Sequence, residues 1–156
     1  MSRKTLAVAL VTVGVFIVVL VAVSVFMKPR PSSALRIGDG AYDAQFATTP
    51  TARAQGLSGT SNLGNTEALV FVFSTDGKWK IWMKDMNYPL DIVWLDNDKS
   101  VIYIVENAPP EGGEDVIFQP PTDARYVIEL SSGSVEAKNI VVGDRAEFDS
   151  NQGEVN

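Results

Sequence analysis

The sequence predicts a mainly β domain, an antiparallel barrel or sandwich with one or two short helices, preceded by one transmembrane helix. Residues 6–27 contain no charged side chain and few polar ones. After residue 34 the apolar residues fall into short runs, several of which alternate with polar residues, and turn-forming residues separate the runs. Short strands at this spacing, with little helical pattern between them, are typical of all-β domains.

The apolar segment at residues 6–27 is long enough to cross a membrane. At ~1.5 Å per residue this helix would reach roughly 33 Å, and a hydrocarbon core is about 30 Å thick. We therefore expect a single-pass anchor in the cell membrane, with the lipid bilayer as its partner. Basic residues flank both ends of the segment, so only the short tail at residues 1–5 favours a C-terminal domain outside the cytoplasm. Signal-peptide cleavage near Ala22 is the alternative.

The remaining chain divides into a linker, one domain and a tail. Residues 28–34 are polar and include Pro29 and Pro31, which predicts a stiff linker that keeps the domain close to the membrane. The domain is expected at residues 35–148, and residues 149–156 are expected to form a disordered acidic tail. Within the domain we expect a hairpin at 35–37 and 41–47, a short helix at 49–56, and strands at 68–73, 79–86, 90–95, 101–105 and 126–130.

Composition excludes several function classes. The residues after position 30 include nine basic and nineteen acidic side chains, a net charge of −10, which argues against binding to nucleic acid. The chain has no histidine and no cysteine. Their absence excludes Ser–His and Cys–His nucleophile pairs and zinc sites built from these ligands. We expect neither a bound metal nor a cofactor.

The segment 79–86 carries an aromatic side chain between two lysines. Strand alternation places Lys80, Trp82 and Lys84 on one face of the predicted strand. In one interpretation Trp82 stacks on a ring of a ligand while a lysine meets an anionic group. In the other, Trp82 covers the core and the lysine stems lie beside it. Trp94 lies in a run that is apolar on both faces, so we expect it in the core.

Two carboxylates interrupt apolar runs and are candidates for buried charges. Asp91 opens the run 90–95, and Glu129 lies in the run 126–130. A buried carboxylate needs a cation or several N–H donors, and Lys84 and Arg53 are the candidate cations. A structural bridge between Lys84 and Asp91, a ligand-facing charge cluster, and a two-carboxylate hydrolase site all fit this pattern. The candidate ligand-binding residues are Arg53, Lys80, Trp82, Lys84, Asp91 and Glu129.

The connection at residues 107–124 is long for a compact domain. It has a pair of prolines near each end and an apolar Val116-Ile117-Phe118 in the middle. Connections of this length tend to be lids or binding loops when they are ordered. We expect a cover strand or lid that docks Phe118 on the domain, with a partner-docking segment as the alternative.

Several motifs occur in the order found in one known family. They are Arg53-Ala54-Gln55-Gly56-Leu57, the run 68–73, the string 82–92 (WMKDMNYPLDI), Ala108-Pro109-Pro110, Tyr126-Val127-Ile128-Glu129-Leu130 and Gly143-Asp144. Over residues 35–148 the chain resembles the domain-of-unknown-function 192 family of small prokaryotic proteins, which are mostly exported or membrane-anchored. The chain departs from the family pattern at Ser58 to Thr60, where Met and Arg are frequent, and at Glu67, where Gly is usual.

The resemblance implies a β-rich fold and no particular chemistry, so two function classes remain. The first is a non-enzymatic binding or envelope-associated module, with an envelope protein or glycan as its partner. The second is a carboxylate- or lysine-dependent hydrolase that acts on an envelope glycan or peptide. The two classes differ in the expected surroundings of Lys84, Asp91 and Glu129: a solvent-filled pocket favours the enzyme, and a closed salt bridge favours the module.

Overall fold

The computed structural model describes residues 32–110 and 113–150, which form two sheets and two short helices. In spatial order the larger sheet contains β1 (Ser32–Ile37), β2 (Gly40–Ala47), β3 (Glu67–Gly77), β8 (Ala124–Ser131), β5 (Leu90–Leu95) and β6 (Val101–Ala108). The smaller sheet pairs β4 (Ile81–Met83) with β7 (Gly113–Phe118). The helices are α2 (Pro50–Gln55) and α3 (Ser134–Ala137).

Parts of the predicted domain plan lie outside the described residues. These parts are the tail at 1–5, the membrane anchor at 6–27, most of the linker at 28–34, and residues 151–156 of the C-terminal tail. Strand β1 begins at Ser32, so the last three residues predicted as linker belong to a strand. Among residues 32–110 and 113–150, no helix is long and apolar enough to cross a membrane.

The mainly β fold with short helices is confirmed, but the larger sheet is open. Its edge strands β1 and β6 do not pair with each other. The segment that follows α3 instead joins both edges, because Glu147 exchanges backbone hydrogen bonds with Arg36 and the Val101 N–H donates to the Asp144 carbonyl at 2.8 Å. One pair, β2 with β3, is parallel. The crossover through α2 returns the chain to the same end of the sheet, as a parallel pair requires.

Local signals in the sequence set the position of α2. The Thr49 hydroxyl accepts a hydrogen bond from the Ala52 N–H at 3.1 Å, and Pro50 occupies the first turn, where it loses no hydrogen bond. Gly56 ends the helix at φ +49°, a conformation that other residues rarely adopt. A Cβ at Gly56 would lie 3.4 Å from the Phe71 ring, an ordinary contact distance, so the backbone conformation and not a lack of space favours glycine here.

The strand predicted at 79–86 is shorter than expected. β4 covers only Ile81–Met83, and Asp85 at φ +52° turns the chain, with its carbonyl accepting from the Gly59 N–H at 2.8 Å. Lys84 therefore lies in a turn and not on a strand. The expected cover strand in the connection 107–124 is confirmed, because β7 pairs with β4 and places a partly buried Phe118 opposite Ile81.

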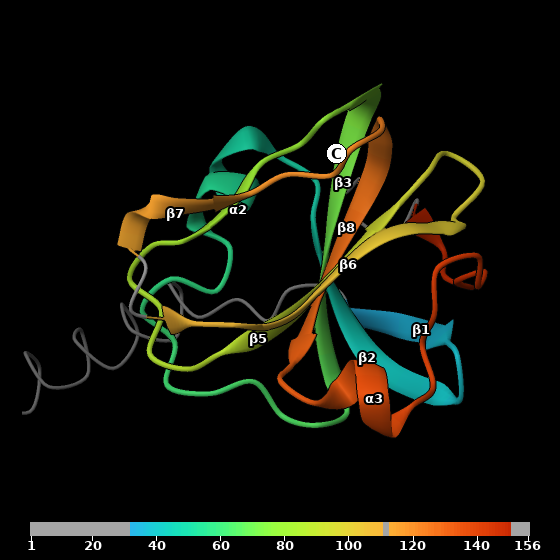
Figure 1. Cartoon of the computed structure of the whole chain (residues 1–156), viewed down its shortest axis with the longest axis horizontal. Helices are drawn as coiled ribbons and strands as arrows, with labels where there is room; N and C mark the ends of the chain where they lie inside the picture. Colours follow the sequence, from blue (N-terminus) through green and yellow to red (C-terminus); the bar gives the residue numbers. More distant parts are fainter. Residues whose placement is uncertain (1–31, 111–112, 151–156) are drawn as a thin grey trace, which may run out of the picture. The chain divides into compact units, whose positions relative to one another are not determined.

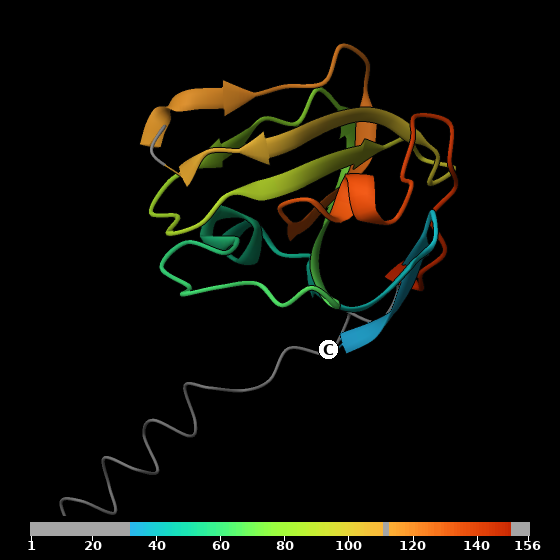
Figure 2. The ribbon, with the colours of Figure 1, turned by 60° about the horizontal axis from the view of Figure 1, so that its bottom comes forward.

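Strand β8 is the centre of the larger sheet and separates two clusters of core side chains. Figure 1 shows the strands crossing at the middle of the molecule, with α2 and β7 at one end and α3 beside β2 at the other. Figure 2 keeps the same grouping in a second view. Ile128 and Leu130 belong to the cluster with β1, β2 and α3. Val127 belongs to the cluster beside α2, β4 and β7, which also contains Trp94 in the predicted core position.

Asp91 is fully buried and holds two segments of backbone in place. Its carboxylate oxygens accept the Asn107 N–H at 2.9 Å and the Val135 N–H at 2.8 Å. Asn107 has a left-handed φ of +53°, and Val135 lies in the single turn of α3, which the sequence did not predict. Of the two ways to satisfy a buried carboxylate, N–H donors and a cation, these contacts supply the first.

We expect Asp91→Ala to lower the free energy of unfolding by about 3 kcal/mol or more, because hydrogen bonds to a charged group contribute about 1.5 to 3 kcal/mol each. Urea denaturation followed by tryptophan fluorescence measures the change. Asp123→Ala removes the same charge from an exposed loop position and should change stability by less than about 0.5 kcal/mol. Equal stability of the two variants would contradict a structural role for Asp91.

Candidate functional site

A cavity of about 320 Å³ lies between α2, β3, β4, β7 and β8. This volume is at the lower end of the range for small-molecule sites, about 300 to 1,000 Å³. The backbone around it is set by the α2 cap, the Gly56 turn and the β4–β7 pair. Most of its walls are apolar, and they include Leu57, Phe71, Phe73, Ile81, Met86 and Ile117.

Glu129 is the carboxyl group that lines this cavity. It projects from the centre of β8, opposite Leu69 on β3 and Ile92 on β5, and it is 4 % exposed. Its Oε2 atom is buried and has no hydrogen-bond partner among the described residues. Burial raises the pKa of Glu129 from 4.5 to about 8, so the carboxyl group is mostly uncharged at pH 7.

Tyr88 lies close enough to Glu129 for the carboxylate charge to affect the pKa of the Tyr88 hydroxyl. Burial raises the pKa of the Tyr88 hydroxyl, and the negative charge of Glu129 raises it further. A hydrogen bond of 2.6 Å between the Tyr88 hydroxyl and Thr60 Oγ1 acts in the opposite direction. The Tyr88 hydroxyl is thus bonded to Thr60, and Oε2 of Glu129 has no partner among the residues that the structure describes.

Arg53 on α2 lines the same cavity and is held by backbone carbonyl groups. Its Nη1 donates to the Thr48 carbonyl at 2.5 Å and to the Val72 carbonyl at 2.9 Å. The guanidinium carbon lies 5.0 Å from the centre of the Phe73 ring, which in turn stacks on Trp79 at 4.1 Å. These contacts fix the orientation of the guanidinium group. The predicted pairing of Arg53 with a buried carboxylate is wrong, because the described residues place no ion pair on Glu129.

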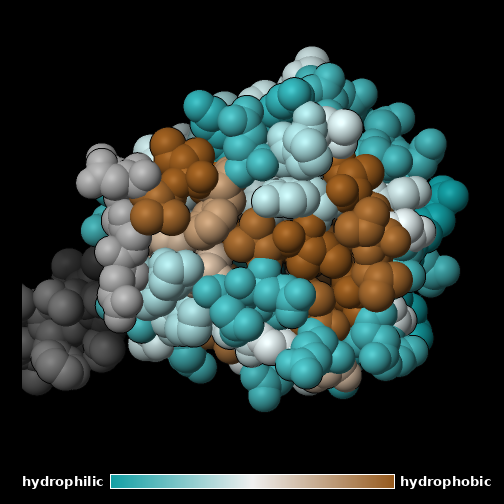
Figure 3. All heavy atoms as spheres, viewed as in Figure 1, coloured by the Kyte–Doolittle hydropathy of each residue, from teal (hydrophilic) through white to brown (hydrophobic). Residues whose placement is uncertain are grey.

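Lys80, Trp82 and Ile117 are exposed residues that line the cavity, and we call them the mouth. Trp82 is 44 % exposed and lies opposite Ile117, which is 50 % exposed, in the β4–β7 pair. Figure 3 shows apolar side chains gathered at the place of β7 and, separately, over β6 at the centre of this face. Trp82 is therefore a half-exposed residue of the cavity wall and belongs to neither cluster of core side chains.

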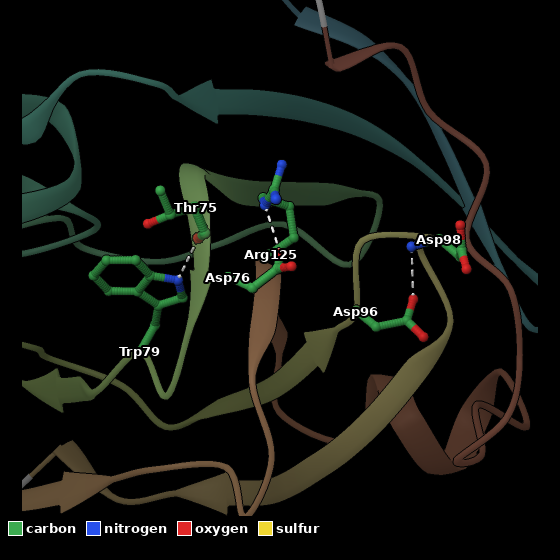
Figure 4. Close-up of polar contacts among 6 residues, drawn as sticks. All are labelled: Thr75, Asp76, Trp79, Asp96, Asp98 and Arg125. Atoms are coloured by element: carbon green, nitrogen blue, oxygen red, sulfur yellow. Dashed lines mark hydrogen bonds and ion pairs between the residues drawn. The ribbon is translucent and has the colours of Figure 1, made fainter.

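The connection between β3 and β4 positions the mouth. The Trp79 indole N–H donates to the Thr75 carbonyl at 3.2 Å, and Arg125 pairs with Asp76 at 2.7 Å (Figure 4). The first contact joins the connection to the end of β3, and the second joins the end of β3 to β8. Lys80 follows directly after this braced segment, at the edge of the cavity.

The structure separates the six predicted site residues. Arg53, Lys80, Trp82 and Glu129 line the cavity. Lys84 lies outside the lining, with its Nζ 5.7 Å from the centre of the Trp82 ring. Asp91 lies opposite Leu130, and Glu129 lies opposite Ile92, so the two carboxylates project from opposite faces of one sheet.

Sequence reasoning missed the apolar lining. Phe71 and Phe73 look like ordinary core residues of a strand, and nothing in the local pattern distinguishes a side chain that faces a cavity from one that faces another side chain. Only Ile117 carried a signal, as part of an apolar triplet within a long connection. Within the described chain, no group of three or more His, Cys, Asp or Glu residues could hold a metal ion.

Comparisons with known proteins agree with this fold. The family model DUF192, described as "Uncharacterized ACR", matches residues 34–148. No curated protein matches the chain.

Two crystal structures are similar to this chain. One, from Sinorhizobium meliloti 1021, is described as a candidate transcription regulator; it is 26% identical, with a TM-score of 0.71 over 75% of this chain and 93% of that one. The other is a protein of unknown function from Novosphingobium aromaticivorans DSM 12444, which is 24% identical with a TM-score of 0.68 over 74% of this chain and 83% of that one. The family match covers most of the chain, and the chain therefore belongs to the DUF192 family.

Proposed function

We propose that this protein is a membrane-anchored binding module whose domain works outside the cytoplasm. Its cavity takes a small, largely apolar ligand that carries a hydrogen-bond acceptor. One observation supports the binding role above all others. Glu129 is a buried carboxyl group whose Oε2 has no hydrogen-bond partner in the described part of the chain, and it lines an apolar cavity.

An unsatisfied buried polar group destabilises a fold, so its presence calls for an explanation. Leaving such a group without a partner costs about 1 to 3 kcal/mol, and an apolar side chain would avoid this cost. Apolar cavities with one or a few polar groups are typical of small-molecule sites, where the polar group orients the ligand. At pH 7 the protonated Glu129 would donate its O–H to a ligand oxygen.

The geometry gives less support to the hydrolase alternative. A two-carboxylate mechanism requires both groups to face the scissile bond. Asp91 and Glu129 face opposite sides of the sheet, and both oxygens of Asp91 are occupied by backbone N–H groups. The Ser58 hydroxyl lines the cavity but donates to the Lys84 carbonyl at 2.8 Å.

The description of the Sinorhizobium protein as a regulator of transcription does not extend readily to this chain. The residues after position 30 carry a net charge of −10. Most of the affinity of DNA-binding proteins comes from cationic contacts to phosphate, which this balance opposes. We therefore propose no nucleic-acid partner for this protein. Its proposed partners are the lipid bilayer and an envelope protein or glycan.

The proposed location predicts the outcome of proteolysis. Protease added to intact spheroplasts should digest the domain from residue 34 onward, because residues 6–27 would hold the chain in the membrane with this part outside. Immunoblotting of the domain measures the digestion, and a cytoplasmic protein serves as the control. Full protection of the domain would reverse the proposed topology.

The proposed state of Glu129 predicts a pH dependence of stability. The folded state keeps the proton up to about pH 8, whereas the unfolded state releases it near 4.5. Stability from this group is complete at acidic pH and is lost as the pH rises from 4.5 to 8, at up to about 1.4 kcal/mol per pH unit. The side chain introduced by Glu129→Gln cannot ionise. The free energy of unfolding of this variant minus that of the parent should therefore grow as the pH rises across this range. An advantage that stays constant from pH 5 to pH 8 would contradict the buried, unpaired state.

The proposed cavity predicts binding of 2-naphthol, an apolar ring system with one hydroxyl oxygen. We expect saturable binding to the full chain in phosphatidylcholine nanodiscs, measured by calorimetry with empty nanodiscs as the blank. Ala54→Phe places a larger side chain on the lining and should weaken binding at least about tenfold, as a loss of 1.4 kcal/mol does. Thr51→Phe, exposed on the same helix but outside the lining, should have no effect. Equal binding by both variants would place the ligand elsewhere.

A further inference from the structure

We propose that the ligand of this cavity is a small aromatic acid whose anionic group lies at the mouth and whose uncharged polar end reaches Glu129. This inference rests on the proposed binding function and adds the class of ligand. Three features of the described lining carry it: the free donors of Arg53, the exposed ammonium of Lys80, and the aromatic walls between them and Glu129.

Arg53 is oriented for an anion but is only partly used by the protein. A guanidinium group has five N–H donors. Its Nη1 serves the Thr48 and Val72 carbonyls, and the donors on Nε and Nη2 have no partner among the described residues. Nε and Nη2 form the edge of the fork that binds carboxylates with two parallel hydrogen bonds. The two backbone contacts and the Phe73 ring therefore hold an arginine that lines the cavity and whose second edge has no partner in the described part of the chain.

The charge of the lining is opposite to that of the domain. Arg53 and Lys80 are two of only nine basic residues after position 30, where nineteen residues are acidic. Both lie on the cavity, and the carboxyl group of Glu129 is mostly uncharged at pH 7. The described lining is therefore positive on an acidic domain, which favours an anionic ligand over an ammonium.

The shape and chemistry of the walls favour a flat apolar body. Phe71 and Phe73 on β3 and Trp82 on β4 contribute aromatic side chains to the lining. Aromatic rings pack well against such side chains in offset or edge-to-face arrangements. Trp82 and Ile117 remain exposed at the mouth, so a ligand held there would cover them.

A matched pair of ligands tests the charge. The pair is 6-hydroxynaphthalene-2-carboxylate and its carboxamide, which share the ring and the distal hydroxyl and differ in one negative charge. We expect the carboxylate to bind the full chain in phosphatidylcholine nanodiscs at pH 7 at least about tenfold more tightly than the carboxamide, which is the scale of a charge-assisted bidentate contact. Octanoate, an acid without a ring, should bind more weakly than the aromatic carboxylate.

Variants of the two cations in the lining, Lys80 and Arg53, test which residues produce the effect. Lys80→Gln should weaken carboxylate binding about two- to fivefold, as expected for an exposed charge, and Arg53→Lys should weaken it about tenfold. Neither should change carboxamide binding by more than about twofold. Lys78→Gln removes the same charge from an exposed residue outside the lining and should leave both ligands unaffected.

The outcomes separate the two proposals. If neither ligand nor 2-naphthol binds, the binding function itself fails. If the carboxamide binds as tightly as the carboxylate, or if Lys80→Gln and Lys78→Gln have equal effects, the cavity function stands and the acid is the wrong ligand class. If octanoate binds more tightly than the aromatic carboxylate, the ligand is still an anion, but the inference that its body is aromatic is overturned. Unchanged thermal melting of Arg53→Lys shows that its effect on binding does not come from unfolding.

Discussion

The candidate site depends on the burial of β8 on both faces. This strand lies between β3 and β5, and each of its faces is covered by a separate cluster of apolar side chains. Residues on alternate positions of a strand face opposite sides, so Tyr126, Ile128 and Leu130 enter one cluster while Val127 enters the other. Glu129 lies on the face of Val127, where it is buried and lines the cavity. The position of the strand, more than the residue itself, makes this glutamate unusual.

The same alternation gives the two buried carboxyl groups, Asp91 and Glu129, different surroundings. Asp91 faces the cluster with α3, where two backbone N–H groups reach it, so its negative charge is satisfied and it links the end of β6 to α3. Glu129 faces the other cluster, where no donor reaches Oε2, so the proton stays on the carboxyl group. A difference of one strand position across β5 and β8 thus separates a structural anion from an uncharged donor.

Membership of the DUF192 family leaves room for variation at this cavity. The chain departs from the family pattern at Ser58 to Thr60, and the structure places Ser58 on the lining and Thr60 in contact with Tyr88. Met or Arg side chains at these positions would be larger than those found here. The departure at Ser58 therefore changes the lining itself.

The sequence by itself determined most of the strands, the cap of α2, the hairpin of β1 and β2 and the family, because these depend on residues near one another along the chain. It overestimated the length of β4, which the turn at Asp85 ends. It also identified Arg53, Lys80, Trp82 and Glu129 as candidate site residues, but within a set of six that included Lys84 and Asp91. Only the tertiary structure decided that these four share a cavity, that Asp91 lies on the opposite face, and that the β2–β3 pair is parallel. Each of these depends on which strands become neighbours. Strand pairing joins residues that are distant in sequence. The periodicity of a strand shows which of its residues point to opposite faces of the sheet, but it does not show what covers each face.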